Sequence, residues 1–150
     1  MTELTAGRAM DRLVAEKVMG WPIIPDSPDS ASEDWFDNYL EAGGALPAVI
    51  VHNDWVEVAY GEFHKDWRAF SPSTDIAAAW RVVEKLLATP LADGDHPIAV
   101  GVRTWFSHEE HGLRASCSIF RSVANDRIVA FGDTAAEAIA RAALKAVRHE

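Results

Sequence analysis

The sequence predicts an α+β fold in which an antiparallel β-meander packs against helices. Two patterns predict it: apolar and polar residues alternate along 98–105 and 113–120, and apolar residues recur at helical spacing near both ends and in the middle of the chain. The length of 150 residues suits one domain, and no apolar run is long enough to cross a membrane. We therefore expect a single domain over residues 1–150.

The first helix is expected over residues 6–19, with Thr5 as its capping residue. Its apolar residues fall on one face: Met10, Leu13, Val14 and Val18. Residues 20–32 carry three prolines among Asp and Ser residues, which favours an irregular connection.

A short second helix and a small hairpin are predicted next. The aromatic spacing within 33–42 favours a helix that ends at Gly43-Gly44. Two β-rich runs, 48–52 and 55–60, are separated by the turn-forming pair Asn53-Asp54.

The central helix is expected at about 74–88. Ser73 or Thr74 offers a capping oxygen, and Asp75 suits the positive end of the helix dipole. We expect its core face to be formed by Ile76, Ala79, Trp80, Val83 and Leu87. Trp80 and Trp21 are interpreted as large apolar packing residues.

The last third is predicted to form three strands and a helix. A polar turn at 108–112 separates the two alternating strands, Ile128 to Phe131 forms a third, and a capping box from Thr134 to Glu137 opens helix 134–148. The apolar stripe of that helix consists mostly of small residues, so the meander at 97–131 should pack closely against it.

Three segments taken together resemble the phage ABA sandwich domain family: residues 13–21, 71–86 and 136–147. The resemblance extends over about 5–21 and 70–148, and leaves 22–69 as a variable, insertion-like segment. It implies an α-β-α layered sandwich, with the meander packed by the N-terminal, central and C-terminal helices, and an origin in a bacteriophage or prophage. It supplies no catalytic residues.

The net charge of −9 is unevenly distributed. Residues 18–64 contain nine Asp or Glu and no Lys or Arg. Such a run is most simply a solvated face, although it could also meet a basic partner or mimic nucleic-acid charge. The acidic balance disfavours attraction to phosphate backbones, so we expect neither nucleic-acid nor membrane binding.

Few residues suggest chemistry. Cys117 is the sole cysteine and lies in an apolar strand pattern, so we expect a buried thiol in a protein of the bacterial host cytoplasm. His108 and His111 lack zinc-helix spacing and belong to a turn. We therefore predict a protein that is not an enzyme and needs no metal or cofactor.

Aromatic residues concentrate in the variable segment, beside a few donors. We expect seven of them to bind a ligand or partner: Trp35, Tyr39, Trp55, Tyr60, His64, Trp67 and Arg68. The first hypothesis is a non-enzymatic phage or prophage accessory protein that binds a host or phage protein through 22–70. The alternative is sequestration of a nucleotide-type small molecule by aromatic stacking and cation contacts. These aromatics could instead serve folding, or a homodimer interface.

Overall fold

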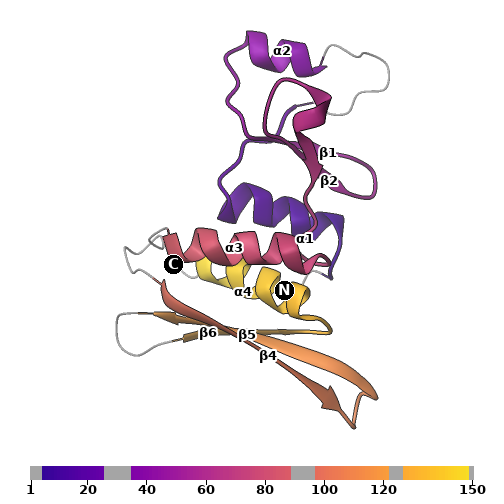
Figure 1. Ribbon diagram of the computed structural model, residues 1–150, viewed down its shortest axis with the longest axis vertical. Coiled ribbons are helices and arrows are strands. Elements are labelled where there is room, and N and C mark those ends of the chain that lie inside the picture. The colour runs from indigo at the N-terminus through magenta and orange to yellow at the C-terminus, as the bar shows by residue number, and fades with distance from the viewer. Residues whose placement is uncertain (1–4, 26–34, 89–96, 122–126, 149–150) are drawn as a thin grey trace.

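The computed structural model describes residues 5–25, 35–88, 97–121 and 127–148 and shows an α+β sandwich (Figure 1). The helical elements are α1 (Arg8–Leu13), a π-helical turn η1 (Val14–Val18), α2 (Trp35–Glu41), a 3-10 turn η2 (His64–Asp66), α3 (Ile76–Ala88) and α4 (Ala135–Arg148). The strands are β1 (Ala48–Val51), β2 (Val56–Ala59), β3 (Trp67–Ala69), β4 (Pro97–Ser107), β5 (Gly112–Arg121) and β6 (Arg127–Gly132).

The strands form two separate antiparallel sheets, with orders β1-β2-β3 and β4-β5-β6. The first, which we call sheet A, lies with α2 at the upper end of Figure 1, and the second, sheet B, lies at the lower end. The remaining helices lie between them. The predicted hairpin and the predicted meander are both confirmed, but the three-residue strand β3 was not anticipated from the sequence.

Strands β1 and β2 of sheet A are buried on both faces, whereas Arg68 and Ala69 of β3 are exposed. Val49 pairs with Val58, and both belong to the main core together with Met10 of α1 and Val14 of η1. The alternate residues Ala48, Ile50 and Ala59 form a second core with Phe36 of α2. Strands of this kind read as continuous apolar runs because neither face meets water.

The described helices cover only one face of sheet B, where α4 packs on all three strands and α3 packs on β4. Ala115, Cys117 and Ile119 of β5 are fully buried and belong to the main core, as predicted. The helix that meets them has six buried alanines: Ala136, Ala138, Ala140, Ala142, Ala143 and Ala146. It also contacts α3 and η1, so its small side chains serve packing on more than one side.

The helix starts differ partly from expectation. α1 begins at Arg8 with no side-chain cap, so the prediction for Thr5 is wrong. At α3 the capping oxygen is that of Asp75, which accepts from the Ala77 N–H at 3.0 Å, rather than that of Ser73 or Thr74. Thr134 does cap α4, accepting from the Glu137 N–H at 3.1 Å.

The predicted core face of α3 is wrong in three places. Ile76, Trp80 and Leu87 are 44%, 45% and 37% exposed, whereas Ala78, Ala79, Val82, Val83 and Leu86 are buried. The helix carries apolar residues around most of its circumference, and the face that meets α4 and sheet B centres on Val82. Leu113 is likewise 68% exposed, because the β4–β5 hairpin extends beyond the helices (Figure 1).

A buried polar contact joins the first helix to the start of α3. Asp11 is 3% exposed, and its carboxylate Oδ1 accepts from the Ser73 N–H at 2.8 Å. The Ser73 hydroxyl in turn accepts from the Gly7 N–H at 2.9 Å. This hydroxyl therefore bonds to the first helix and not to α3, which it was predicted to cap. Burial raises the pKa of Asp11 despite these hydrogen bonds.

None of the described helices combines the length and the apolar character that a membrane span requires. The irregular connection predicted over 20–32 is described only to Pro25, where Ile23 forms an isolated parallel bridge with Val49. The rest of it lies outside the described residues.

The packing of α4 predicts that it does not tolerate a larger side chain. Ala142→Leu should destabilise the protein by about 1–3 kcal/mol, because the inserted atoms meet a filled core. Ala77→Leu, at an exposed alanine of α3, should change stability by less than about 0.5 kcal/mol. Urea unfolding of both variants measures the difference, and equal stabilities would contradict the packing described.

The raised pKa of Asp11 predicts a specific pH dependence. The unfolded chain ionises this carboxyl near its ordinary value of 3.8, whereas the native state holds the proton to higher pH. The stability of the wild type relative to Asp11→Asn should therefore fall as pH rises from 3.8 through the native pKa. Urea titrations of both proteins at several pH values measure this slope, and a difference that stays constant with pH would refute it.

Candidate functional site

Two of the predicted aromatic residues, Trp35 and Trp67, have neighbours that give them a structural role. Trp67 of β3 packs against Phe36 and Trp35 of α2, with ring centroids 5.0 and 6.0 Å away. The Trp67 indole also donates to the Gly61 carbonyl at 3.3 Å. Trp35 and Trp67 thus help hold α2 on sheet A. Whether they also bind a partner stays a prediction.

Tyr39 and Trp55 are likewise engaged locally, at different places. The Tyr39 hydroxyl donates to the Ala45 carbonyl at 2.7 Å, and a Cβ on Gly44 would lie 2.4 Å from the Tyr39 ring, so only glycine fits there. Trp55 stacks on His52 at the β1–β2 turn, with centroids 4.2 Å apart. The side chain of His64 lies outside those that the structure describes.

Tyr60 and Arg68 do come together. They line an open hollow of about 590 Å³ beside α3, with Met19, Trp21, Arg81, Glu84 and Lys85 as its other walls. Trp21 meets Tyr60 edge to face at 5.8 Å, and Phe70 at 5.1 Å. Trp21 is therefore a packing residue, as predicted, but one that also borders this hollow.

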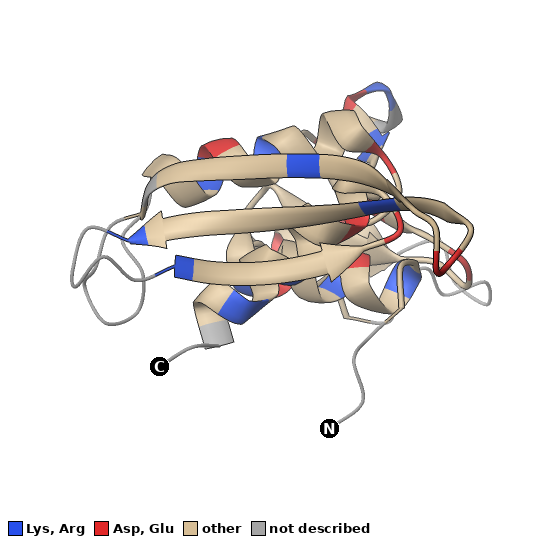
Figure 2. Cartoon of the chain, turned by 90° about the horizontal axis from the view of Figure 1, so that it is seen from below, with Lys and Arg blue, Asp and Glu red and all other residues tan. Residues whose placement is uncertain are grey.

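A second surface, absent from the sequence-based predictions, is the face of sheet B that points away from the helices. All the helices lie on the other side of this sheet (Figures 1 and 2). Register places Arg103 opposite Ser116 and Trp105 opposite Arg114 on this outer face. Phe131 and Phe120 lie there too and are 52% and 37% exposed.

These residues enclose a groove of about 470 Å³. Its floor consists of three small residues on β4 and β5: Gly101, Ser116 and Ser118. The other lining residues surround this floor: Val102, Arg103, Trp105, Phe120, Arg127, Val129 and Phe131. The Trp105 and Phe131 rings meet edge to face at 6.3 Å. The Arg103 guanidinium lies 5.5 Å from the centre of the Trp105 ring.

The charge of sheet B is the opposite of the charge of the chain. Its three strands contain four arginines and no Asp or Glu, in a protein of net charge −9. Figure 2 shows basic positions on every strand and acidic ones at the hairpin turn beyond them. The groove is therefore a basic surface with aromatic walls on an acidic protein.

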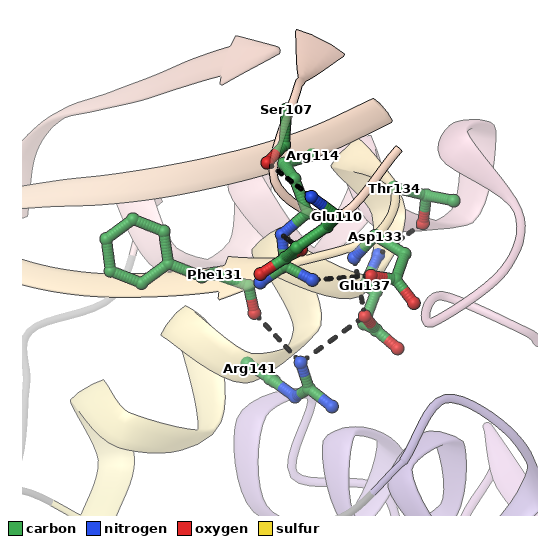
Figure 3. Close-up of polar contacts among 8 residues, drawn as sticks. All are labelled: Ser107, Glu110, Arg114, Phe131, Asp133, Thr134, Glu137 and Arg141. Atoms are coloured by element: carbon green, nitrogen blue, oxygen red, sulfur yellow. Dashed lines mark hydrogen bonds and ion pairs between the residues drawn. The ribbon is translucent and has the colours of Figure 1, made fainter. Parts of the chain in front are cut away.

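One end of the groove is fixed by polar contacts to the neighbouring turn and to α4 (Figure 3). Arg114 forms ion pairs with Glu110 at 3.0 Å and with Asp133 at 2.6 Å. Arg141 donates to the Phe131 carbonyl at 2.9 Å and to Glu137, which accepts in turn from the Asp133 N–H. Phe131 is thereby held on a rigid strand end.

Elsewhere in the described structure, the side chains that could take part in catalysis or bind a metal are buried or dispersed. Burial raises the pKa of the Cys117 thiol to about 12, which removes the thiolate that a nucleophile would need. His108 and His111 are exposed in the hairpin turn, as expected. Within the described ranges, no three His, Cys, Asp or Glu residues gather where they could hold a metal ion.

The groove had a signal in the sequence. The alternation that assigns Ala115, Cys117 and Ile119 to the core also assigns Arg103, Trp105 and Phe120 to the opposite face. A solvated sheet face normally carries polar residues, so tryptophan and phenylalanine at these positions indicate a surface with a further role.

Comparisons with known proteins agree with this fold. A family model for the phage ABA sandwich domain matches residues 12–144, and the chain belongs to that family. No curated protein matches the chain. The crystal structure of a phage protein from Bacillus cereus ATCC 14579 is similar, with a TM-score of 0.50 and 19% identity over 99% of this chain and 93% of that one. At this identity the likeness concerns the fold.

The position of the outer aromatics predicts that they contribute little to folding. Phe131→Thr keeps a strand-forming residue at a half-exposed position, so it should change stability by no more than about 1 kcal/mol. Ile119→Ala, on the buried face of the same sheet, should cost about 2–5 kcal/mol. Thermal and urea unfolding compare the two, and a large loss for Phe131→Thr would assign that ring to the fold.

Proposed function

We propose that this protein is a non-enzymatic phage accessory protein that binds and sequesters a nucleotide-type small molecule in the groove on sheet B. The observation that carries the proposal is the combination of Arg103, Trp105 and Phe131 around a floor of glycine and serine. Aromatic rings can stack on a base, and guanidinium groups bind phosphate through paired hydrogen bonds. Small residues beneath them leave space for the ligand.

The size and charge of the surface favour a small anion. A groove of about 470 Å³ lies within the roughly 300–1,000 Å³ typical of small-molecule sites. A long polyanion would be repelled by the net charge of −9, whereas a small ligand meets mainly the local arginines. The same negative net charge led us to expect no nucleic-acid partner.

The composition of the groove lining also favours binding over catalysis. Among the described residues, its polar lining consists of arginine and serine side chains, without a histidine, carboxylate or cysteine to transfer a proton or attack a bond. Sequestration of a host nucleotide signal would need binding alone, and family membership supplies the phage context.

Thermal shift and calorimetry with AMP, ATP, cyclic AMP and cyclic di-AMP test the proposal. At least one should raise the melting temperature with concentration. Gly101→Val should abolish that binding, because a Cβ at Gly101 contacts only Phe120 at an ordinary 3.6 Å and the larger side chain then fills the groove. Ala99→Val is the matched control, since Ala99 lies on the same face but outside the groove lining.

Arg103→Gln should weaken the same ligand about tenfold or more and reduce the salt dependence of binding. Separate measurements with adenosine and with inorganic phosphate show how much of the affinity comes from the nucleoside and how much from the phosphate. The proposal would be refuted if none of the nucleotides binds, or if Gly101→Val binds the ligand as tightly as the wild type does.

A second candidate function is the binding of a protein partner through the 22–70 segment. The observation that favours it is the exposure of three aromatics there: Phe63 at 64%, and Trp55 and Tyr60 at 39% each. Trp55 stacks on His52 and Tyr60 meets Trp21, but each ring keeps part of its surface exposed. Loss of a captured host or phage protein in Phe63→Ser, with nucleotide binding unchanged, would favour this function.

A further inference from the structure

α3 has an apolar stripe that nothing in the described structure covers. Ile76, Trp80 and Leu87 are spaced by four and seven residues, so they lie in line along one border of the exposed face. Figure 1 shows α3 in front of α4, with no other element over it. A half-exposed tryptophan flanked by two aliphatic residues is the composition of an interface core.

Charged residues of both signs accompany the stripe. Arg81, Glu84 and Lys85 follow on the same exposed side of α3, and none forms an ion pair with another described residue. Arg81 and Glu84 are one helical turn apart but make no contact close enough for an ion pair. They are thus open to partners outside the chain.

The hollow described above adjoins this helix. Arg81, Glu84 and Lys85 form one wall of it, and Trp21 and Tyr60 another. The surface therefore combines a ridge of apolar side chains with a depression about 590 Å³ in volume. A twofold contact requires one patch that is complementary to itself, in shape and in charge.

We propose that this face of α3 is the interface of a homodimer, with α3 of one copy antiparallel to α3 of the other. The stripe is centred between Arg81 and Val82, so the antiparallel arrangement sets Ile76 opposite Leu87 of the second copy. The two Trp80 rings then lie beside one another at the twofold axis.

Charge selects a second copy over an unrelated partner. In the antiparallel arrangement Arg81 of each copy comes within reach of Glu84 of the other, so both ion pairs form at once. A partner of one sign would leave either Glu84 or the two bases opposed. The site differs from the 22–70 aromatics that the sequence suggested as a dimer interface, and from the groove on sheet B.

Light scattering coupled to size exclusion, and sedimentation equilibrium over the micromolar range, test the proposal on the full chain. The wild type should be a dimer. Trp80→Glu should raise the dissociation constant at least about tenfold, because it places a charge at the centre of the interface. Phe106→Ser is the matched control, since Phe106 is 53% exposed and lies on the distant hairpin.

A charge swap tests the orientation. Glu84→Arg should weaken the dimer by opposing like charges, and the double variant Arg81→Glu/Glu84→Arg should restore it. Circular dichroism confirms that the variants, all at exposed positions, remain folded. The proposal would be overturned by a wild type that is monomeric at every concentration, or by a dimer that Trp80→Glu leaves intact. Binding of an unrelated protein to a single copy through Trp80 would also overturn it.

Discussion

The arrangement of this protein depends on a helix, α4, whose buried side chains are mostly small. α4 contacts sheet B on one side and α3 and η1 on others, and its buried positions are mostly alanine, with Ile139 and Leu144 as the main exceptions. Short side chains let neighbouring backbones approach closely. The approach is close enough that a Cβ on Gly132, where β6 leads into α4, would lie 2.8 Å from the Glu137 carboxylate. A bulkier helix would separate the sheet from the helical layer.

Because α4 packs on the inner face of sheet B and no described element packs on its outer face, the outer side chains are not part of the core. Its aromatics and arginines are supported from behind by a rigid, fully packed core, and from the side by the ion pairs of Arg114. Sheet A shows the contrary case: α2 lies on one face and α1 on the other, so most residues of β1 and β2 belong to the core, and Trp35, Phe36 and Trp67 join α2 to β3. Rigid support behind a solvent-facing surface is what a preorganised binding site requires.

The features that could be predicted from sequence are those set by local chemistry. The α4 cap needs only Thr134 and Glu137, and the strands of sheet B follow from residue alternation. Features set by tertiary arrangement could not be predicted. The apolar residues of α3 occupy most of its circumference, so the sequence did not decide whether Trp80 or Val82 faces the core. β3 has three residues, too few for a periodic pattern. The outer position of Trp105 was readable, but the absence of a covering helix was not, since that depends on where α3 and α4 lie.

The separation of the two sheets also separates charge along the molecule. The strands of sheet B carry four arginines, whereas the described segment 35–69 around sheet A has six acidic and two basic residues. Because these groups lie toward opposite ends of the long axis (Figure 1), they contribute an electric dipole along that axis. This dipole would orient the molecule so that sheet B faces an approaching anion. Added salt shortens the Debye length and would therefore weaken this orientation.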